Sequence, residues 1–154
     1  MPEIVFSTTQ VSDELFHNGL IHKVYNFSLS DEFQTRFENY RIENPDRFYE
    51  MSSNWDGLYF KLKIKNNRLY LVSLKFDCDL NEYPKAEDII GKFDSKEGIF
   101  ASWFSGEVIE YFGEPYLAHM SSHSRIFEFK NGILIGIQER VSKGYQEYQK
   151  RLSN

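Results

Sequence analysis

The stretch GLYFKLKIKNNRLYLVSLKFD, residues 57–77, decides how this chain folds. Apolar side chains alternate with lysines over its first half, as Phe60, Leu62 and Ile64 against Lys61, Lys63 and Lys65. A period of two is typical of a strand with one buried face. Asn66 and Asn67 suit a tight turn, because asparagine tolerates positive φ. Arg68 to Asp77 then returns as a second strand, so the sequence predicts a β-hairpin over 57–77.

Further strands are predicted on both sides of this hairpin. Asn131-Gly132 is the strongest short-range hairpin signal in the chain, and it separates the apolar runs 125–130 and 133–138. Aromatic residues make up 17% of the chain and fit pleated surfaces, which favours sheet. The remaining predicted strands are 3–7, 20–29, 116–120 and 99–112, the last interrupted at Ser105-Gly106.

Two helices are predicted with their caps. Ser30 is a suitable N-cap for a helix that ends at Asn44-Pro45, because the residue before a proline avoids the α region. The apolar face of this helix consists of Phe33, Phe37 and Tyr40. A second helix is predicted over 142–152. Residues 81–91 are expected to form a short helix or an irregular connection.

These elements predict an α+β fold with an antiparallel, strongly curved sheet of about six to eight strands and two or three flanking helices. The chain of 154 residues fits a single domain, 1–154. Its one cysteine, Cys78, excludes an internal disulfide and lies between two aspartates, which work against a thiolate. Neither a signal peptide at Met1-Pro2-Glu3 nor a membrane-spanning apolar run is visible, so we expect a soluble cytoplasmic protein without membrane contact.

The negative charge is concentrated in one stretch. The formal net charge is −5, but residues 77–114 hold ten acidic and three basic side chains, and the rest of the chain is slightly basic. A local field of one sign steers partners of the opposite sign, although a solvated acidic face has the same composition. Both interpretations disfavour nucleic acid, because a phosphate backbone requires a basic footprint.

No local pattern amounts to a catalytic or metal site. His119 and His123 are four residues apart, but they fall on a strand end and a turn, so we expect ordinary hydrogen-bonded histidines. Ser105 lacks the glycine that a nucleophile elbow requires two residues earlier. Carboxylate pairs such as Glu107 and Glu110 are expected by number alone in so acidic a stretch. We therefore predict no enzyme, no cofactor and no bound metal.

Two segments around tryptophan are the most distinctive in the chain, Trp55-Asp56-Gly57 and Trp103-Phe104-Ser105-Gly106. A tryptophan beside a glycine can form a wall on which a ligand stacks. It can equally be a large core aromatic that packs over a glycine. The sequence favours the core interpretation and leaves the ligand wall as an alternative.

The order of several short motifs resembles a family of small bacterial α+β proteins with no assigned chemistry. The motifs are Trp55-x-Gly57-x-Tyr59, Arg68-Leu69-Tyr70-Leu71, Ala101-Ser102-Trp103-Phe104-Ser105-Gly106-Glu107 and Phe127-Glu128-Phe129. The resemblance covers about residues 45–135 and departs from the family pattern where Leu58 separates the glycine from the tyrosine. It implies a bacterial source and a small α+β fold, and it carries over no catalytic residue.

Small acidic bacterial domains without catalytic motifs include many immunity proteins, which bind and neutralise a cognate toxin. An acidic face speeds association with a basic toxin. The sequence therefore predicts a non-catalytic, toxin-binding protein, with partner contacts at Asp77, Asp79, Glu82, Glu87 and Asp88. The alternative is a small-ligand-binding or enzymatic domain with a pocket lined by Trp55 and Trp103. A module that associates through a sheet edge also stays open, and the oligomeric state is not predicted.

Overall fold

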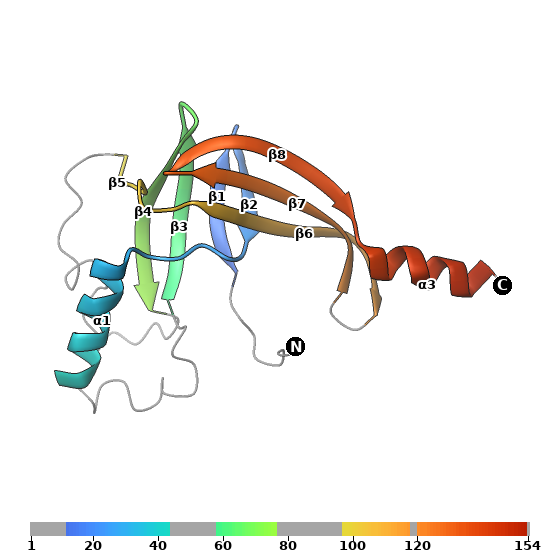
Figure 1. Cartoon of the computed structure of the whole chain (residues 1–154), viewed down its shortest axis with the longest axis horizontal. Helices are drawn as coiled ribbons and strands as arrows, with labels where there is room; N and C mark the ends of the chain where they lie inside the picture. Colours follow the sequence, from blue (N-terminus) through green and yellow to red (C-terminus); the bar gives the residue numbers. More distant parts are fainter. Residues whose placement is uncertain (1–11, 44–57, 77–96, 118–119, 154) are drawn as a thin grey trace.

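The computed structural model describes residues 12–43, 58–76, 97–117 and 120–153 as an eight-stranded sheet with two helices (Figure 1). The helices are α1 (Asp31–Glu43) and α3 (Lys143–Ser153). The strands are β1 (Asp13–His17), β2 (Leu20–Val24), β3 (Leu58–Lys65), β4 (Arg68–Phe76), β5 (Ile99–Phe100), β6 (Gly106–Leu117), β7 (Met120–Lys130) and β8 (Ile133–Val141). The predicted α+β class and the predicted number of strands are confirmed.

Asparagine-containing turns of two residues close three of the hairpins. Asn18-Gly19 joins β1 to β2, Asn66-Asn67 joins β3 to β4, and Asn131-Gly132 joins β7 to β8, with φ between 50° and 78° at all six residues. Such turns match the twist of antiparallel strands, and asparagine and glycine tolerate their positive φ. The last two hairpins were predicted. The first was missed, because the sequence analysis placed one strand over 20–29 and overlooked β1.

The sheet is mostly antiparallel, as predicted, but one pair of strands is parallel, which makes it a mixed sheet. Its strand order is β2-β1-β3-β4-β8-β7-β6, with β5 paired to β4. β1 runs parallel to β3, with Leu15 beside Leu62, and the chain reaches β3 through β2 and α1. The sheet is not strongly curled or closed, which corrects the predicted strong curvature. Within the described residues, the end of β2 approaches β6 through backbone hydrogen bonds between Tyr25, which follows β2, and Ile109.

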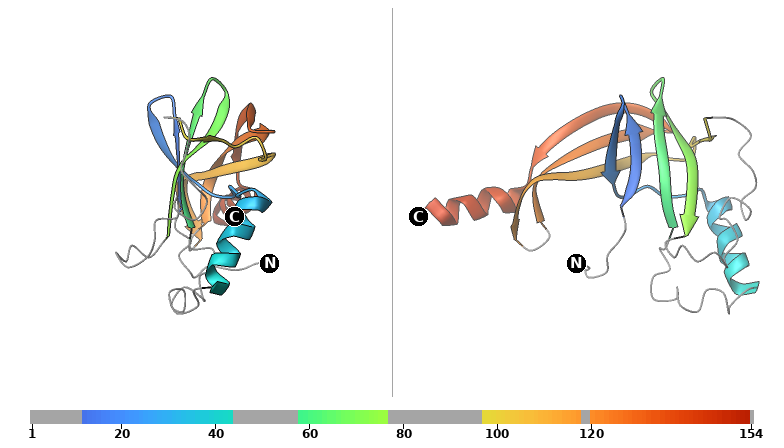
Figure 2. Two further views of the ribbon diagram at one scale, coloured as in Figure 1. Left: turned by 90° about the vertical axis from the view of Figure 1, so that its left-hand side faces the viewer. Right: turned by 180° about the vertical axis from the view of Figure 1, so that it is seen from behind.

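The core lies between the inward face of β1–β4 and the adjacent ends of β6 and β7 (Figure 2). The predicted apolar side of β3 is buried, and Phe127 of β7 is fully buried. Between the two halves, the ring of Phe27 lies 5.1 Å from the rings of both Phe60 and Phe104. The hairpin that decides the fold is therefore covered by strands that come much later in the chain.

α1 begins as the sequence predicts. The Oγ atom of Ser30 accepts a hydrogen bond from the backbone N–H of Phe33 at 3.2 Å, which satisfies one free donor of the first turn. Phe33 and Phe37 pack against the core. The last described residue of the helix precedes Asn44-Pro45. The predicted strand 3–7 and the connection 81–91 lie outside the described residues.

β6, β7 and β8 extend beyond the core as a three-stranded arm, and α3 continues from its far end (Figures 1 and 2). We use the term arm for residues 110–117, 120–126 and 137–141. Two strand predictions are wrong here, because residues 101–105 separate β5 from β6, and β6 continues to Leu117 instead of ending before a new strand at 116. α3 has no buried residue, so it does not flank the sheet.

Candidate functional site

The five predicted contact residues, Asp77, Asp79, Glu82, Glu87 and Asp88, lie outside the described residues, as does Cys78. The described part of the acidic stretch contains Glu97, Glu107, Glu110 and Glu114. Glu114 accepts a hydrogen bond from the Tyr145 hydroxyl at 3.3 Å. The surroundings of the other three carboxylates show how much of the predicted negative field is neutralised within the fold.

Glu97 is neutralised by two lysines of β3. Its Oε1 atom accepts a hydrogen bond from Nζ of Lys65 at 2.6 Å, and its other oxygen accepts one from Lys63. These bonds lower the pKa of Glu97 to about 2, and the same contact raises the pKa of Lys65. The lysines share one side of β3 because the other side is buried. The charge of Glu97 is therefore used within the fold, in ion pairs with Lys63 and Lys65.

Glu110 is held between β2 and β7. Its Oε1 atom lies 3.0 Å from Nδ1 of His22 and also accepts a hydrogen bond from Arg125. Nη2 of Arg125 reaches Glu139 of β8 at 2.7 Å, and the bonds to Glu139 and Glu110 raise the pKa of Arg125. The side chains of His22, Glu110 and Arg125 are only 11, 17 and 26% exposed. This network ties β2 to all three strands of the arm.

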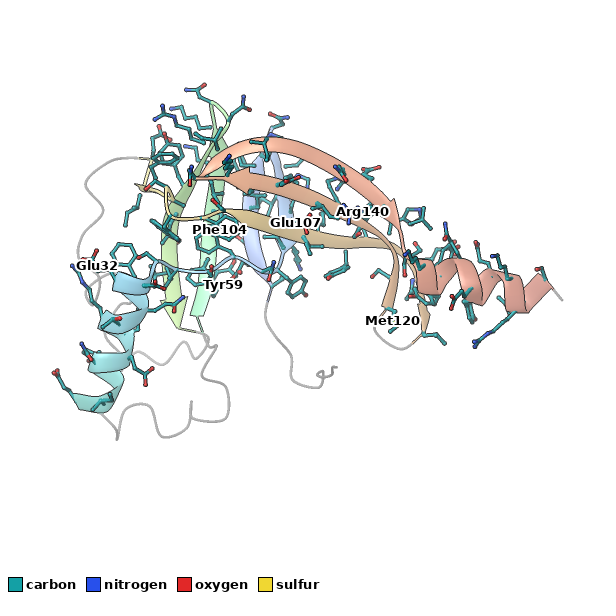
Figure 3. The ribbon with its side chains drawn as sticks, viewed as in Figure 1. Glu32, Tyr59, Phe104, Glu107, Met120 and Arg140 are labelled. Atoms are coloured by element: carbon teal, nitrogen blue, oxygen red, sulfur yellow. The ribbon has the colours of Figure 1, made fainter. Side chains whose placement is uncertain are left out.

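Glu107 of β6 and Glu128 of β7 lie directly opposite each other (Figure 3 labels Glu107). Both are half-buried, and neither carboxylate has an ion pair or hydrogen bond within the described part of the chain. Gly136 is the neighbour of Glu128 on β8, so no side chain lies on that flank. Like charges in direct register destabilise a sheet. Glu107 and Glu110 do not form a carboxylate pair, because their spacing puts them on opposite faces of β6.

His123 lies in β7 and not in the predicted turn. Its Nδ1 atom lies 2.5 Å from Oγ of the fully buried Ser122, which also accepts the backbone N–H of Glu114 at 2.8 Å. His119 lies outside the described residues. Among those described, no cluster of three His, Cys, Asp or Glu side chains is arranged to hold a metal ion.

Trp103 is half-buried and packs against the core. Its Nε1 atom donates a hydrogen bond to the backbone oxygen of Ser28 at 2.9 Å, and its ring lies 5.7 Å from that of Phe33. The second tryptophan of the proposed ligand wall, Trp55, lies outside the described residues. Ser105 has a structural partner, because its Oγ atom accepts the backbone N–H of Asn131 at 2.9 Å.

The outward face of β1–β4 carries most of its charge as lysine and arginine. We call it the basic face, and it consists of Lys23, Lys61, Lys63, Lys65 and Arg68 with the acidic Glu14 and Glu97. An open groove of about 360 Å³ lies on this face. This face was not predicted from the sequence. The alternating lysines of β3 were a visible signal, but the neighbouring β1 and β2 were not predicted as a hairpin.

Comparison with protein-family models, with curated proteins and with solved structures finds no match to this chain. The resemblance to small bacterial α+β proteins therefore stays a prediction. Among the described residues, no helix is long and apolar enough to cross a membrane.

Proposed function

We propose that this chain is a non-catalytic binding protein, namely a cytoplasmic immunity protein that binds and neutralises a basic toxin domain of bacterial origin. Its contact surface comprises the acidic side chains of the sequence prediction, Asp77, Asp79, Glu82, Glu87 and Asp88, together with Glu107 and Glu128. The observation that supports the proposal is the register of Glu107 and Glu128, which brings two carboxylates together without a described cation.

The free chain bears an energetic cost that a basic partner can remove. Two carboxylates in direct register destabilise a strand pair by about 0.2–1 kcal/mol relative to neutral residues. An arginine or lysine of a partner placed between Glu107 and Glu128 turns this repulsion into two attractions. Complementary charge also raises the association rate and excludes partners of the wrong sign. A carboxylate pair retained at such a position is therefore more useful for binding than for folding.

Not every carboxylate of the acidic stretch belongs to the proposed surface. Glu97 is neutralised by lysines of β3, and Glu110 by Arg125 and His22. The field available to a partner is therefore weaker than the composition of 77–114 indicates. Glu107 and Glu128 are the described positions at which the proposal is most directly testable.

The test begins with the tagged full chain, expressed in its source bacterium together with its neighbouring genes. The copurifying protein is identified, purified and titrated against the double variant Glu107→Lys/Glu128→Lys. We expect a basic protein whose Kd rises about tenfold or more, equivalent to about 1.4 kcal/mol, mainly through a slower association rate. Glu147→Lys in the exposed α3 is the control, and it should bind as the unchanged chain does.

Equal binding by the double variant and the control would remove Glu107 and Glu128 from the surface. An acidic partner, or a partner whose binding does not weaken at high salt, would contradict the immunity proposal itself. Absence of any protein partner would favour the alternative, a small-ligand-binding or enzymatic domain with Trp55 and Trp103 at its pocket. That alternative is then tested by following tryptophan fluorescence during titration with small molecules.

A further inference from the structure

The basic face is built from rows of side chains that cross neighbouring strands. In the first row, Glu14 of β1 lies between Lys23 of β2 and Lys61 of β3. The second row consists of Ile21, Phe16 and Lys63. Side chains in register on adjacent strands point to the same side of a sheet. A charged row therefore lies directly beside a mainly apolar one.

Two lysines of this face have no acidic partner of their own. Glu97 neutralises the lysines nearest the β3–β4 turn, whereas Lys23 and Lys61 form no ion pair within the described residues. Glu14, which separates them, accepts a hydrogen bond from the Tyr59 hydroxyl. Burial and then this bond raise the pKa of Tyr59. Lys23 and Lys61 are thus available to an external anion.

The groove on this face has an apolar floor that is open to solvent. Phe16, Ile21 and Val72 line it, together with Glu14, Lys61 and Lys63. Phe16 is 45% and Ile21 is 62% exposed, although both are large apolar side chains on short strands. Exposed apolar residues rimmed by charged ones mark surfaces that bind other molecules. The groove and the free lysines are adjacent, so one ligand can use both.

We propose that the basic face binds an acidic, apolar segment of a partner protein. The apolar side chains of that segment pack on Phe16 and Ile21, while its carboxylates pair with Lys23 and Lys61. Charge complementarity selects this partner, because the basic face has five basic and two acidic residues although the whole chain has a net charge of −5. The proposal concerns a different surface and an oppositely charged partner, so it does not rest on the proposed immunity function.

The shape of the face favours a protein segment over other anions. Small-molecule sites are concave and bury most of their ligand, whereas this groove is open and its rim is exposed. A nucleic acid is bound through many phosphate contacts along a basic track, and only two lysines here lack a partner in the described structure. An extended peptide with an apolar and an acidic side chain two residues apart presents both to this face, because residues i and i+2 share a side, and the two rows are also two residues apart along β1.

The experiment pans a displayed library of short random peptides against the full chain and measures binding of the selected peptides by fluorescence anisotropy. Two variants with the same change of charge are compared, Lys23→Glu/Lys61→Glu on the basic face and Lys143→Glu/Lys150→Glu on the exposed α3. We expect acidic, apolar peptides whose Kd rises at least about tenfold in the first variant and stays within about twofold in the second. Ile21→Ser should weaken binding without a change in salt dependence, and thermal melts by circular dichroism confirm that each variant is folded.

The proposal would be overturned if the selected peptides were not predominantly acidic. It would also be overturned if Lys23→Glu/Lys61→Glu and Lys143→Glu/Lys150→Glu lowered peptide affinity equally. Tighter binding of a single-stranded oligonucleotide, or of vesicles that contain phosphatidylserine, would assign the face to a different class of ligand. Self-association in sedimentation experiments that Lys23→Glu/Lys61→Glu abolishes would assign it to a second copy of this chain. The variant Glu107→Lys/Glu128→Lys should retain peptide binding. The peptide-binding proposal and the immunity proposal can therefore fail independently of each other.

Discussion

Several side chains have structural roles that only distant partners explain. Glu110 belongs to an acidic stretch in the sequence, but in the fold it lies between Arg125 and His22. Alternation along β6 predicts which face a residue occupies and not what lies opposite, so the sequence analysis counted Glu110 as free negative charge. The same limit hid the contact between Glu107 and Glu128, because their register depends on how β6 and β7 are joined.

Replacing Glu110 by glutamine should destabilise the fold by about 2 kcal/mol, because Arg125 and His22 are partly buried and lose a charged acceptor. Urea unfolding should show a lower midpoint with an unchanged slope. Glu139→Gln is the matched control. Glu139 binds the same arginine but is 58% exposed, and its loss should cost less than about 1 kcal/mol. A larger effect for Glu139 would show that the network is not anchored at Glu110.

Turn chemistry predicts individual hairpins in this protein better than it predicts the sheet. Asn66-Asn67 and Asn131-Gly132 were recognised because clear alternation flanks them. Asn18-Gly19 is an equally strong turn, but β1 carries buried Asp13 beside buried Leu15, which hides its period. Asp13 is buried because its carboxylate accepts the backbone N–H of Phe60 at 2.9 Å. The parallel pairing of β1 with β3 joins segments far apart in the sequence and could not be predicted from alternation.

Substitution of two glycines in equivalent turns allows the cost of backbone strain to be measured apart from the cost of steric overlap. Gly19 and Gly132 have φ of 78° and 77°, but an added Cβ meets nothing within 4 Å at Gly19, whereas at Gly132 it lies 2.6 Å from the Ala101 backbone oxygen. Gly19→Ala should cost about 1–2 kcal/mol for the left-handed conformation alone. Gly132→Ala should cost at least about 1 kcal/mol more through overlap. If Gly19→Ala and Gly132→Ala had equal midpoints in chemical unfolding, the β7–β8 turn would have room for a Cβ beside the backbone of Ala101.

On the scale of the whole molecule, the predicted strands and helices indicate the α+β class but not the distribution of charge over its surface. Along the sequence, one acidic stretch stands in a slightly basic remainder. The fold instead gathers lysines from β2 and β3, with Arg68 of β4, on one outward face, and it neutralises Glu97 there. The distribution of charge over the surface depends on strand order and register. Neither can be predicted from the pattern of adjacent residues along the sequence.

Acid should weaken the contact between Glu97 and β3 in a defined window. The folded state holds the pKa of Glu97 at about 2, below its ordinary value of 4.5, so the folded state binds this proton less readily than the unfolded state. Its stabilising contribution is therefore complete above about pH 5 and is lost as the pH falls from 4.5 towards 2. The difference in unfolding free energy between the unchanged chain and Glu97→Gln should narrow across that window. A difference that stays constant with pH would contradict this ion pair.

The late position of Phe127 has a consequence for synthesis. During translation, the hairpins β1–β2 and β3–β4 leave the ribosome well before β7. Yet β7 supplies the fully buried Phe127, which belongs to the core that covers the inward faces of these hairpins. Until β7 emerges, Leu15, Leu62 and Leu71 lack the part of the core that this strand supplies, although all three are almost wholly buried in the finished fold. Such transiently exposed apolar faces attract chaperones and invite aggregation. We therefore expect the described sheet to be completed only late in translation, when β6, β7 and β8 pack over the hairpins already made.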